Sequence, residues 1–345
     1  MKRVLSLVLA LMLMVACVGC GSNDKDGSAS ADSSNTTQSA TNSTASDGGD
    51  EITELDVVYL MPATSSQYWY DYMCTGVMNA AMDIEAETGV KINVTTAGPA
   101  EEMETEAYVK AFENVIASKP DIILTATLVP DGTNLLVKEA HNQGIYVNFM
   151  SCGLEDPAYD EYFGSFFYCN NADIGGVAAQ AFLDALDAKG IEHKGKVGVH
   201  TSVLVPSLMP RIDEFVAYLN EHAPELECLE VLFNENVITK AQSNVEAQIA
   251  AYGDELVGFY GSDNITGDGI ALAIQNSGLT GKVAGVVVDA DDLEVEALRN
   301  GVLDAIVVQT PYMQSYEAMW DAFNYLTKGE TQDKRVITPS FAVTT

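Results

Sequence analysis

The stretch VAGVVVDADDLEVEALRNGVLDAIVVQTP, residues 283–311, decides the fold of this chain. Its β-branched run at residues 286–288 stops at Asp289, and a second apolar run at residues 302–308 stops at Gln309. The acidic residues after Asp289 are suited to cap a helix between the two runs. The stretch therefore predicts two buried parallel strands joined by a helix. Because ligands of open α/β sheets bind beyond the carboxyl ends of the strands, we expect Asp289 and Gln309 to face one ligand.

Segments of the same kind flank this stretch. From residue 55 onward, apolar runs of strand length alternate with segments of helical periodicity. This alternation predicts α/β architecture with parallel, doubly wound sheets. Because the pattern restarts after residue 150, we predict two similar Rossmann-like lobes. Further strands are predicted at residues 55–61, 90–95, 121–125, 145–150, 162–168, 195–201, 228–233 and 257–260, and further helices at 68–87, 101–118, 133–143, 175–189, 210–222, 240–252, 270–276 and 316–328.

The first 54 residues differ in character from the rest of the chain. Residues 1–16 combine two basic residues with an apolar run too short to span a bilayer, which predicts a secretion signal. The cysteines that follow resemble the lipid-attachment site of bacterial lipoproteins, with Cys17 as the predicted lipidated residue and Cys20 as the alternative. An ordinary cleaved signal is the other interpretation. The Ser-, Thr- and Asp-rich remainder of residues 17–54 predicts a disordered linker.

The charge balance excludes some classes of partner. The chain has 17 basic and 50 acidic residues and a net charge of −33. No basic patch is expected at this balance, which argues against nucleic-acid binding and against binding anionic lipid through the protein surface. Such acidity is typical of a soluble, exposed protein.

The sequence carries no motif of a catalytic or metal site. Its four histidines are isolated, and it has no nucleophile elbow and no phosphate-binding glycine loop with a lysine. No cysteine pair has the spacing of a zinc or thioredoxin-like site. We therefore predict a binding protein without enzyme activity, cofactor or metal. Disulfides and free thiols both remain open for Cys74, Cys152, Cys169 and Cys228, and Cys152 with Cys169 is the first pair to test.

Four features over residues 55–345 resemble the type I periplasmic binding proteins, in the branch that binds sugars for ABC importers. Residues 65–69 combine polar residues with aromatics like those that stack on the sugar in that family, and residues 173–176 resemble its Gly-Gly helix start. Residues 262–263 match an Asn-Asp position of the family. The most specific feature is Asp289 and Gln309, separated by an Asn-Gly turn at the family's spacing.

The resemblance implies a function, a location and partners. The chain would be a lipid-anchored substrate-binding protein on the outer face of the bacterial cytoplasmic membrane. It would act as a monomer, close its hinge on a monosaccharide or a sugar-like polar solute, and deliver that solute to an ABC permease. The alternative is a receptor that signals to a membrane sensor or chemoreceptor. The proline-containing loop at residues 129–132 is more similar to autoinducer-2 receptors, and residues 207–209 replace a pocket arginine of the sugar binders.

The resemblance also implies two lobes and a three-segment hinge. The first lobe would comprise residues 55–150 and 310–337, and the second residues 151–309 and 338–345. The chain would cross between them near residues 150–151, 309–310 and 338. The predicted ligand-binding residues are Ser66, Tyr68, Trp69, Asp131, Arg211, Ser262, Asp263, Asp289 and Gln309, with Asn171 and Asn236 as weaker candidates.

Most of these residues have a structural alternative. Tyr68 and Trp69 also suit ordinary core packing, although a helix cannot bury these two and Tyr70 on one face. Asp131 is equally suited to cap a helix that starts at residue 133, and Arg211 to pair with a nearby carboxylate. The polar residues at 262–263 suit a plain helix start. Asp289 also suits capping of its own helix, and Gln309 suits bonding to the hinge backbone.

Overall fold

The computed structural model describes residues 52–204 and 208–345. The predicted signal peptide, the lipidation residues Cys17 and Cys20, nearly all of the predicted linker, and Ser207 lie outside the described residues. Among the described residues, no helix is long and apolar enough to cross a membrane.

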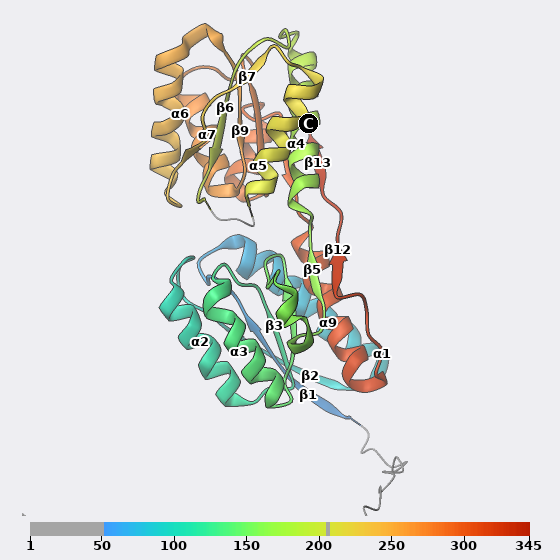
Figure 1. Cartoon of the computed structure of the whole chain (residues 1–345). Coiled ribbons are helices and arrows are strands. Elements are labelled where there is room, and N and C mark those ends of the chain that lie inside the picture. The colour runs from blue at the N-terminus through green and yellow to red at the C-terminus, as the bar shows by residue number, and fades with distance from the viewer. Residues whose placement is uncertain (1–51, 205–207) are drawn as a thin grey trace, which may run out of the picture. The chain divides into compact units, whose positions relative to one another are not determined.

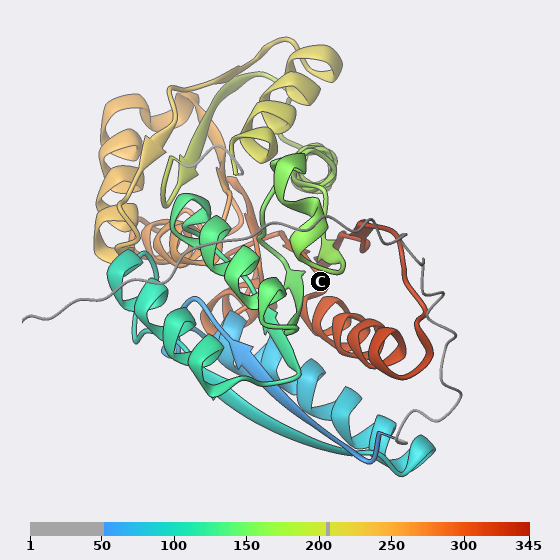
Figure 2. The ribbon, with the colours of Figure 1, turned by 60° about the horizontal axis from the view of Figure 1, so that its bottom comes forward.

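The first sheet has six parallel strands in the order β12-β5-β4-β3-β1-β2 (Figure 1). Side chains alternate along β1, so that Val57 and Tyr59 face one layer of helices while Val58 and Leu60 face the other. Helices α1 and α9 cover the first face, and α2 and α3 cover the second (Figures 1 and 2). The elements are β1 (Glu54–Leu60), η1 (Tyr68–Met73), α1 (Cys74–Thr88), β2 (Lys91–Ala97), α2 (Thr105–Ser118), β3 (Ile122–Thr125), α3 (Pro130–Asn142), β4 (Tyr146–Met150), η2 (Pro157–Tyr162), β5 (Phe166–Tyr168), α9 (Pro311–Lys328) and β12 (Arg335–Ile337).

The second sheet has the order β13-β11-β10-β9-β6-β7, with β8 paired to β6. All its pairs are parallel except β13 with β11. Helices α4 and α5 pack on one face and α6, α7 and α8 on the other. The elements are α4 (Asn171–Lys189), β6 (Gly195–Thr201), α5 (Met209–His222), β7 (Leu226–Cys228), β8 (Leu232–Phe233), α6 (Ile238–Tyr252), η3 (Gly253–Glu255), β9 (Leu256–Gly261), α7 (Asn264–Asn276), β10 (Ala284–Val288), α8 (Asp292–Arg299), β11 (Ala305–Val308) and β13 (Phe341–Thr344). The prediction of two parallel-sheet α/β lobes is confirmed.

The first crossing between the sheets lies later in the chain than we predicted. Strand β5 pairs with β4 and β12 in the first sheet, so the chain leaves that sheet after Tyr168 rather than at residues 150–151. The physical reason is a reversal at Ser151, whose φ of 62° turns the chain back over its own lobe. Half of the predicted strand at residues 162–168 forms instead the end of η2 and a turn.

Cys169 lies where the three crossing segments meet. Its thiol donates a hydrogen bond of 2.7 Å to the carbonyl oxygen of Gln309 and lies 3.4 Å from the Thr338 hydroxyl. It is therefore a free thiol in contact with the second and third crossings. Cys152 and the other two described cysteines are free as well, and the disulfide between Cys152 and Cys169 is absent from the structure.

We expect the two neighbouring glycines of α4 to respond oppositely to alanine. A Cβ at Gly175 would lie 2.2 Å from the backbone oxygen of Arg211 in α5, whereas a Cβ at Gly176 would have its nearest neighbour 3.8 Å away. Gly175→Ala should therefore push the two helices apart and lower the free energy of unfolding by about 1–3 kcal/mol. Gly176→Ala is the matched control and should raise it by up to about 1 kcal/mol through helix propensity. Equal urea midpoints for the two variants would contradict this packing.

Candidate functional site

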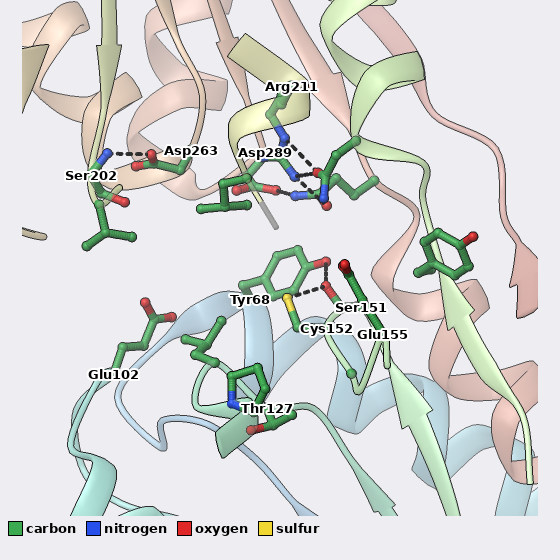
Figure 3. A pocket seen from close by; sticks show the side chains of 18 of the residues that line it. Tyr68, Glu102, Thr127, Ser151, Cys152, Glu155, Ser202, Arg211, Asp263 and Asp289 are labelled. Atoms are coloured by element: carbon green, nitrogen blue, oxygen red, sulfur yellow. Dashed lines mark hydrogen bonds between the residues drawn. The ribbon is translucent and has the colours of Figure 1, made fainter. Parts of the chain in front are cut away.

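A cavity of about 660 Å³ is lined by residues of both lobes, beyond the carboxyl ends of the strands (Figure 3). We call it the cleft pocket. Six of the predicted site residues line it, namely Tyr68, Trp69, Arg211, Asp263, Asp289 and Gln309. Asp289 and Gln309 line one cavity because they follow β10 and β11, which are neighbours in the sheet.

The buried guanidinium of Arg211 organises the second-lobe side of the cleft pocket. Its Nε and Nη2 donate to Oδ1 of Asn171 at 3.0 and 2.7 Å, and Nη1 donates to the backbone oxygen of Ser262 at 2.5 Å. Nη2 also donates to Oε1 of Gln309 at 3.1 Å. The amide of Gln309 then donates through Nε2 to Oδ1 of Asp289 at 2.5 Å. This series of hydrogen bonds fixes which end of the Gln309 amide faces Asp289.

Asp289 is held in an uncommon backbone conformation. Its φ is 83°, in the left-handed region, and its backbone N–H donates to the Val307 oxygen of the neighbouring strand at 2.9 Å. Burial raises the pKa of its carboxyl to about 6, while the charge of Arg211 and the hydrogen bond from Gln309 oppose this rise. Such strained residues cluster at functional sites. Asp289 does not cap α8, because Asp291 fills that position.

Asp263 caps helix α7 and also lines the cleft pocket. Its side chain caps α7 by accepting a 3.0 Å hydrogen bond from the Thr266 backbone N–H, and it also accepts a 2.8 Å bond from the Ser202 N–H. Its neighbour Ser262 is fully buried behind the pocket and donates to Thr201 at 2.8 Å. Ser262 therefore supports the site through its carbonyl, which holds Arg211.

A π-helical segment places the aromatic residues on the first-lobe side. Helix η1 is wider than an α-helix, a form that is frequent at functional sites. The Tyr68 hydroxyl lies 2.9 Å from Oγ of Ser151, and its ring meets Trp69 edge-on with a centroid distance of 4.7 Å. Trp69 is buried and donates its indole N–H to Glu102 at 2.6 Å. Tyr70, the third aromatic, is exposed.

Three predicted ligand residues do not line the cleft pocket. Ser262 lies behind it, and Ser66 contacts the Glu102 side chain instead. Asp131 is exposed and makes no capping bond, because Pro130 takes the first helical position and Val129 becomes the cap residue of α3. The capping role that we weighed for Asp131 is therefore absent, and its ligand-binding role stays a prediction at a residue that does not line the pocket.

Several residues that line the cleft pocket were not among the predicted site residues. Glu102 was placed inside a predicted helix, yet α2 begins only at Thr105, after Met103 with a φ of 63°. Ser151 was assigned to a hinge and not to the site. The sequence offered one usable signal, which is that polar residues directly follow the ends of predicted strands. The missed lining residues include Glu102, Thr127, Ser151, Cys152, Tyr168, Asn170, Ser202 and Asn264, while the weaker candidates Asn171 and Asn236 do line the pocket.

The cleft pocket offers groups for reversible binding of a small polar molecule. Carboxylates, amides, hydroxyls and aromatic rings line it. Burial raises the pKa of the Cys152 thiol to about 11, which keeps this lining group protonated at neutral pH. Among the described residues, no cluster of His, Cys, Asp and Glu has the geometry to hold a metal ion. A few convergent polar groups in an otherwise apolar cavity are typical of a ligand site.

We expect Arg211→Met to destabilise the folded protein. The variant keeps the aliphatic packing but removes four hydrogen bonds, one to the buried oxygen of Ser262 and three to partly buried oxygens of Asn171 and Gln309. A buried acceptor that loses its donor costs about 1–3 kcal/mol, and with the smaller cost of the partly buried bonds we expect a total loss near 3 kcal/mol in urea unfolding. Arg299→Met, on an exposed arginine, is the matched control. Equal unfolding midpoints for the two variants would contradict this role of Arg211.

Comparison with known proteins gives one family and a set of related structures. The sequence profile of the family described as periplasmic binding protein domain matches residues 57–331. A search of curated proteins found no match to the chain.

The related structures have the same fold at low sequence identity. A carbohydrate transporter solute-binding protein from Agrobacterium radiobacter, in complex with D-arabinose, is 24% identical with a TM-score of 0.72, over 85% of this chain and 95% of that one. An ABC transporter solute-binding protein from Agrobacterium vitis, bound to α-D-tagatopyranose, is 24% identical with a TM-score of 0.74, over 84% and 94%. A sugar-binding protein of a sugar ABC transporter from Bacillus halodurans is 20% identical with a TM-score of 0.73, over 84% and 97%.

Proposed function

Because this chain belongs to the periplasmic binding protein domain family, we propose that it captures a monosaccharide or a sugar-like polar solute in the cleft pocket. The observation that carries the proposal is the chain of hydrogen bonds from Arg211 through Gln309 to Asp289, which faces Tyr68 and Trp69 across one cavity. A fixed carboxylate can accept hydrogen bonds from sugar hydroxyls, while aromatic rings suit the apolar faces of a sugar. Related structures with bound arabinose and tagatose support this ligand class.

Ligand binding would act through hinge closure. The loop that carries Asp289 also contacts the first lobe, since Ala290 accepts a 2.6 Å hydrogen bond from the Tyr72 hydroxyl and the Asp292 N–H donates to Gln67 at 3.3 Å. A solute that contacts Asp289 and the aromatic pair would bridge both lobes and favour the closed state. Binding and closure would thus be linked through one loop.

The protein would deliver its solute to an ABC permease, as a monomer on the outer face of the cytoplasmic membrane. The related solute-binding proteins of ABC transporters support this role. Lipid attachment at Cys17, or at Cys20, would anchor the folded lobes through the linker. Mass spectrometry of the mature N-terminus tests this anchor, and an unmodified terminus would contradict it.

A thermal-shift screen tests the binding function directly. Purified protein is heated with pentoses, hexoses, deoxysugars, polyols, nucleosides and autoinducer-2, because a ligand that binds the folded state raises its melting temperature by mass action. We expect a rise with at least one sugar-like compound, followed by a measured Kd in calorimetry. If no member of these classes raises the melting temperature, the proposed function fails.

A further inference from the structure

The charges that line the cleft pocket are unbalanced. Among its described lining residues are two arginines, Arg211 and Arg335. Against these stand the carboxyl groups of Glu102, Glu155, Asp156, Asp263 and Asp289. The net charge of the whole chain, −33, adds to this negative potential, which attracts cationic solutes and repels anionic ones.

Both arginines are already engaged by acceptors within the protein. Arg211 is 3% exposed, and each of its three nitrogens already donates to a protein acceptor. Arg335 is paired with Asp160 at 2.8 Å and also donates to the Leu154 oxygen at 3.1 Å. An anionic group in the pocket would therefore face carboxylates, while both guanidinium groups already have partners in the protein.

Two of the carboxylates line the pocket from opposite lobes. Glu102 precedes α2 in the first lobe and points toward the second lobe, whereas the Asp263 carboxylate at the start of α7 is turned toward Ser202 (Figure 3). Both oxygens of Asp263 accept hydrogen bonds within the second lobe, from Ser202, Ser262 and Thr266, so that it acts on the pocket through its charge. Burial raises the pKa of Glu102, and the negative charge of Asp263 raises it further. Two like charges on opposing lobes resist closure, whereas a cation between them would be attracted to both.

The aromatic pair favours the same kind of ligand. Trp69 fixes the Glu102 carboxylate through its indole N–H, and Tyr68 lines the cavity beside it. Ring faces of tryptophan and tyrosine attract cations as well as the apolar face of a sugar. A hydroxylated ring with one amine would thus satisfy the acceptors, the rings and the charge imbalance together.

This inference rests on the proposed function and narrows its ligand class. We propose that the solute of the cleft pocket carries a protonated amine beside its hydroxyl groups, as an amino sugar does. The amine donates to Glu102 on the first lobe and is attracted by the charge of Asp263 on the second lobe, so that it joins the two lobes electrostatically. Neutral sugars bind more weakly, and sugars with a carboxylate or phosphate are rejected.

Matched sugars test this proposal in calorimetry at pH 7. D-glucosamine, D-galactosamine and D-mannosamine are each compared with the parent hexose, the N-acetylated form and the uronic acid. We expect at least one amine to bind about tenfold or more tightly than its parent, consistent with a charge-assisted hydrogen bond. N-acetylation should remove that gain, and the uronic acids should not bind. A parent hexose that binds as tightly as every amine would overturn the inference while leaving the proposed function intact.

A variant locates the amine within the pocket. Glu102→Gln keeps an acceptor for the Trp69 indole but removes the charge, so the ratio of amine to parent affinity should fall about tenfold. Glu101→Gln, on the exposed neighbouring acid, is the control and should leave that ratio unchanged. An unchanged ratio in Glu102→Gln would overturn the placement of the amine at Glu102. If none of the sugars, charged or neutral, binds the wild-type protein, the proposed function fails and this inference fails with it.

Discussion

Ligand binding is expected to disappear in Asp289→Gly and to weaken about 10–100-fold in Asp289→Asn, as befits the loss of one charge-assisted hydrogen bond. The glycine variant removes the carboxylate and the acceptor of the Gln309 amide. The asparagine variant keeps an oxygen but loses the charge. Both residues tolerate the φ of 83° at this position, whereas alanine would be strained there and would confuse loss of binding with loss of folding.

The experiment compares ligand-induced stabilisation in these variants with that of the wild type. The unliganded variants should melt cooperatively, and Asp289→Asn should melt at or above the wild-type temperature at neutral pH, because burial disfavours the ionised carboxyl of the wild type. Asp292→Asn changes an exposed acid three residues away and is the matched control. Full stabilisation by ligand in both Asp289 variants would show that the ligand does not bind where we propose.

The parts of the site that were predictable depend on local sequence. The β-branched run at residues 286–288 predicts a buried strand, and a polar residue directly after such a strand must lie at its carboxyl end. This reasoning placed Asp289 and Gln309 in one cavity without any knowledge of distant contacts. The same local reasoning predicted the alternation of strands and helices and hence the α/β class.

The parts that were not predictable depend on turns and on distant partners. Whether β5 joins the first or the second sheet is decided by its pairing with β4 and β12, and β12 lies more than 160 residues away. The role of Glu102 depends on where α2 starts, and a shift of four residues moved it from a helix into the pocket wall. The capping role of Asp131 was wrong for the same reason, because α3 begins at Pro130, three residues before the predicted start. Periodicity locates helices but not the residue at which they begin.

A buried group of acids behind the Asp289 loop leads to the second large predicted effect, a dependence of folding stability on pH. Asp268 on α7 is 5% exposed and Glu294 on α8 is fully buried, and Asp291 caps α8 beside them. Within the described part of the chain, none of the three forms an ion pair, and Oδ1 of Asp268 and Oε1 of Glu294 are buried without a hydrogen-bond partner. Burial, then the charge of Asp291 and its hydrogen bond, raise the pKa of Asp268 to about 8. Burial likewise raises the pKa of Glu294 well above its usual range.

The sign of the resulting pH dependence follows from proton linkage. Between about pH 4 and pH 8 the folded protein keeps a proton on Asp268, while the unfolded chain, with a pKa of 3.8, has released it. Unfolding then releases a proton, so rising pH favours the unfolded state. Below this window both states are protonated and the group has no effect. Above it both states are ionised and the loss of stability is complete.

Asp268→Asn is therefore expected to gain stability over the wild type as pH rises from 5 to 8. The difference in free energy of unfolding should grow by up to about 1.4 kcal/mol per pH unit and level off above pH 8. Urea unfolding at each pH measures this difference, and Asp292→Asn, on an exposed acid at the start of α8, should differ from the wild type by a constant amount. The self-repulsion of the acidic surface changes with pH in all three proteins. It cancels when the free energy of unfolding of the wild type is subtracted from that of each variant. A gain that is the same at pH 5 and pH 8 would mean that Asp268 is ionised in the folded protein, and the buried acids would then need a cation to hold them.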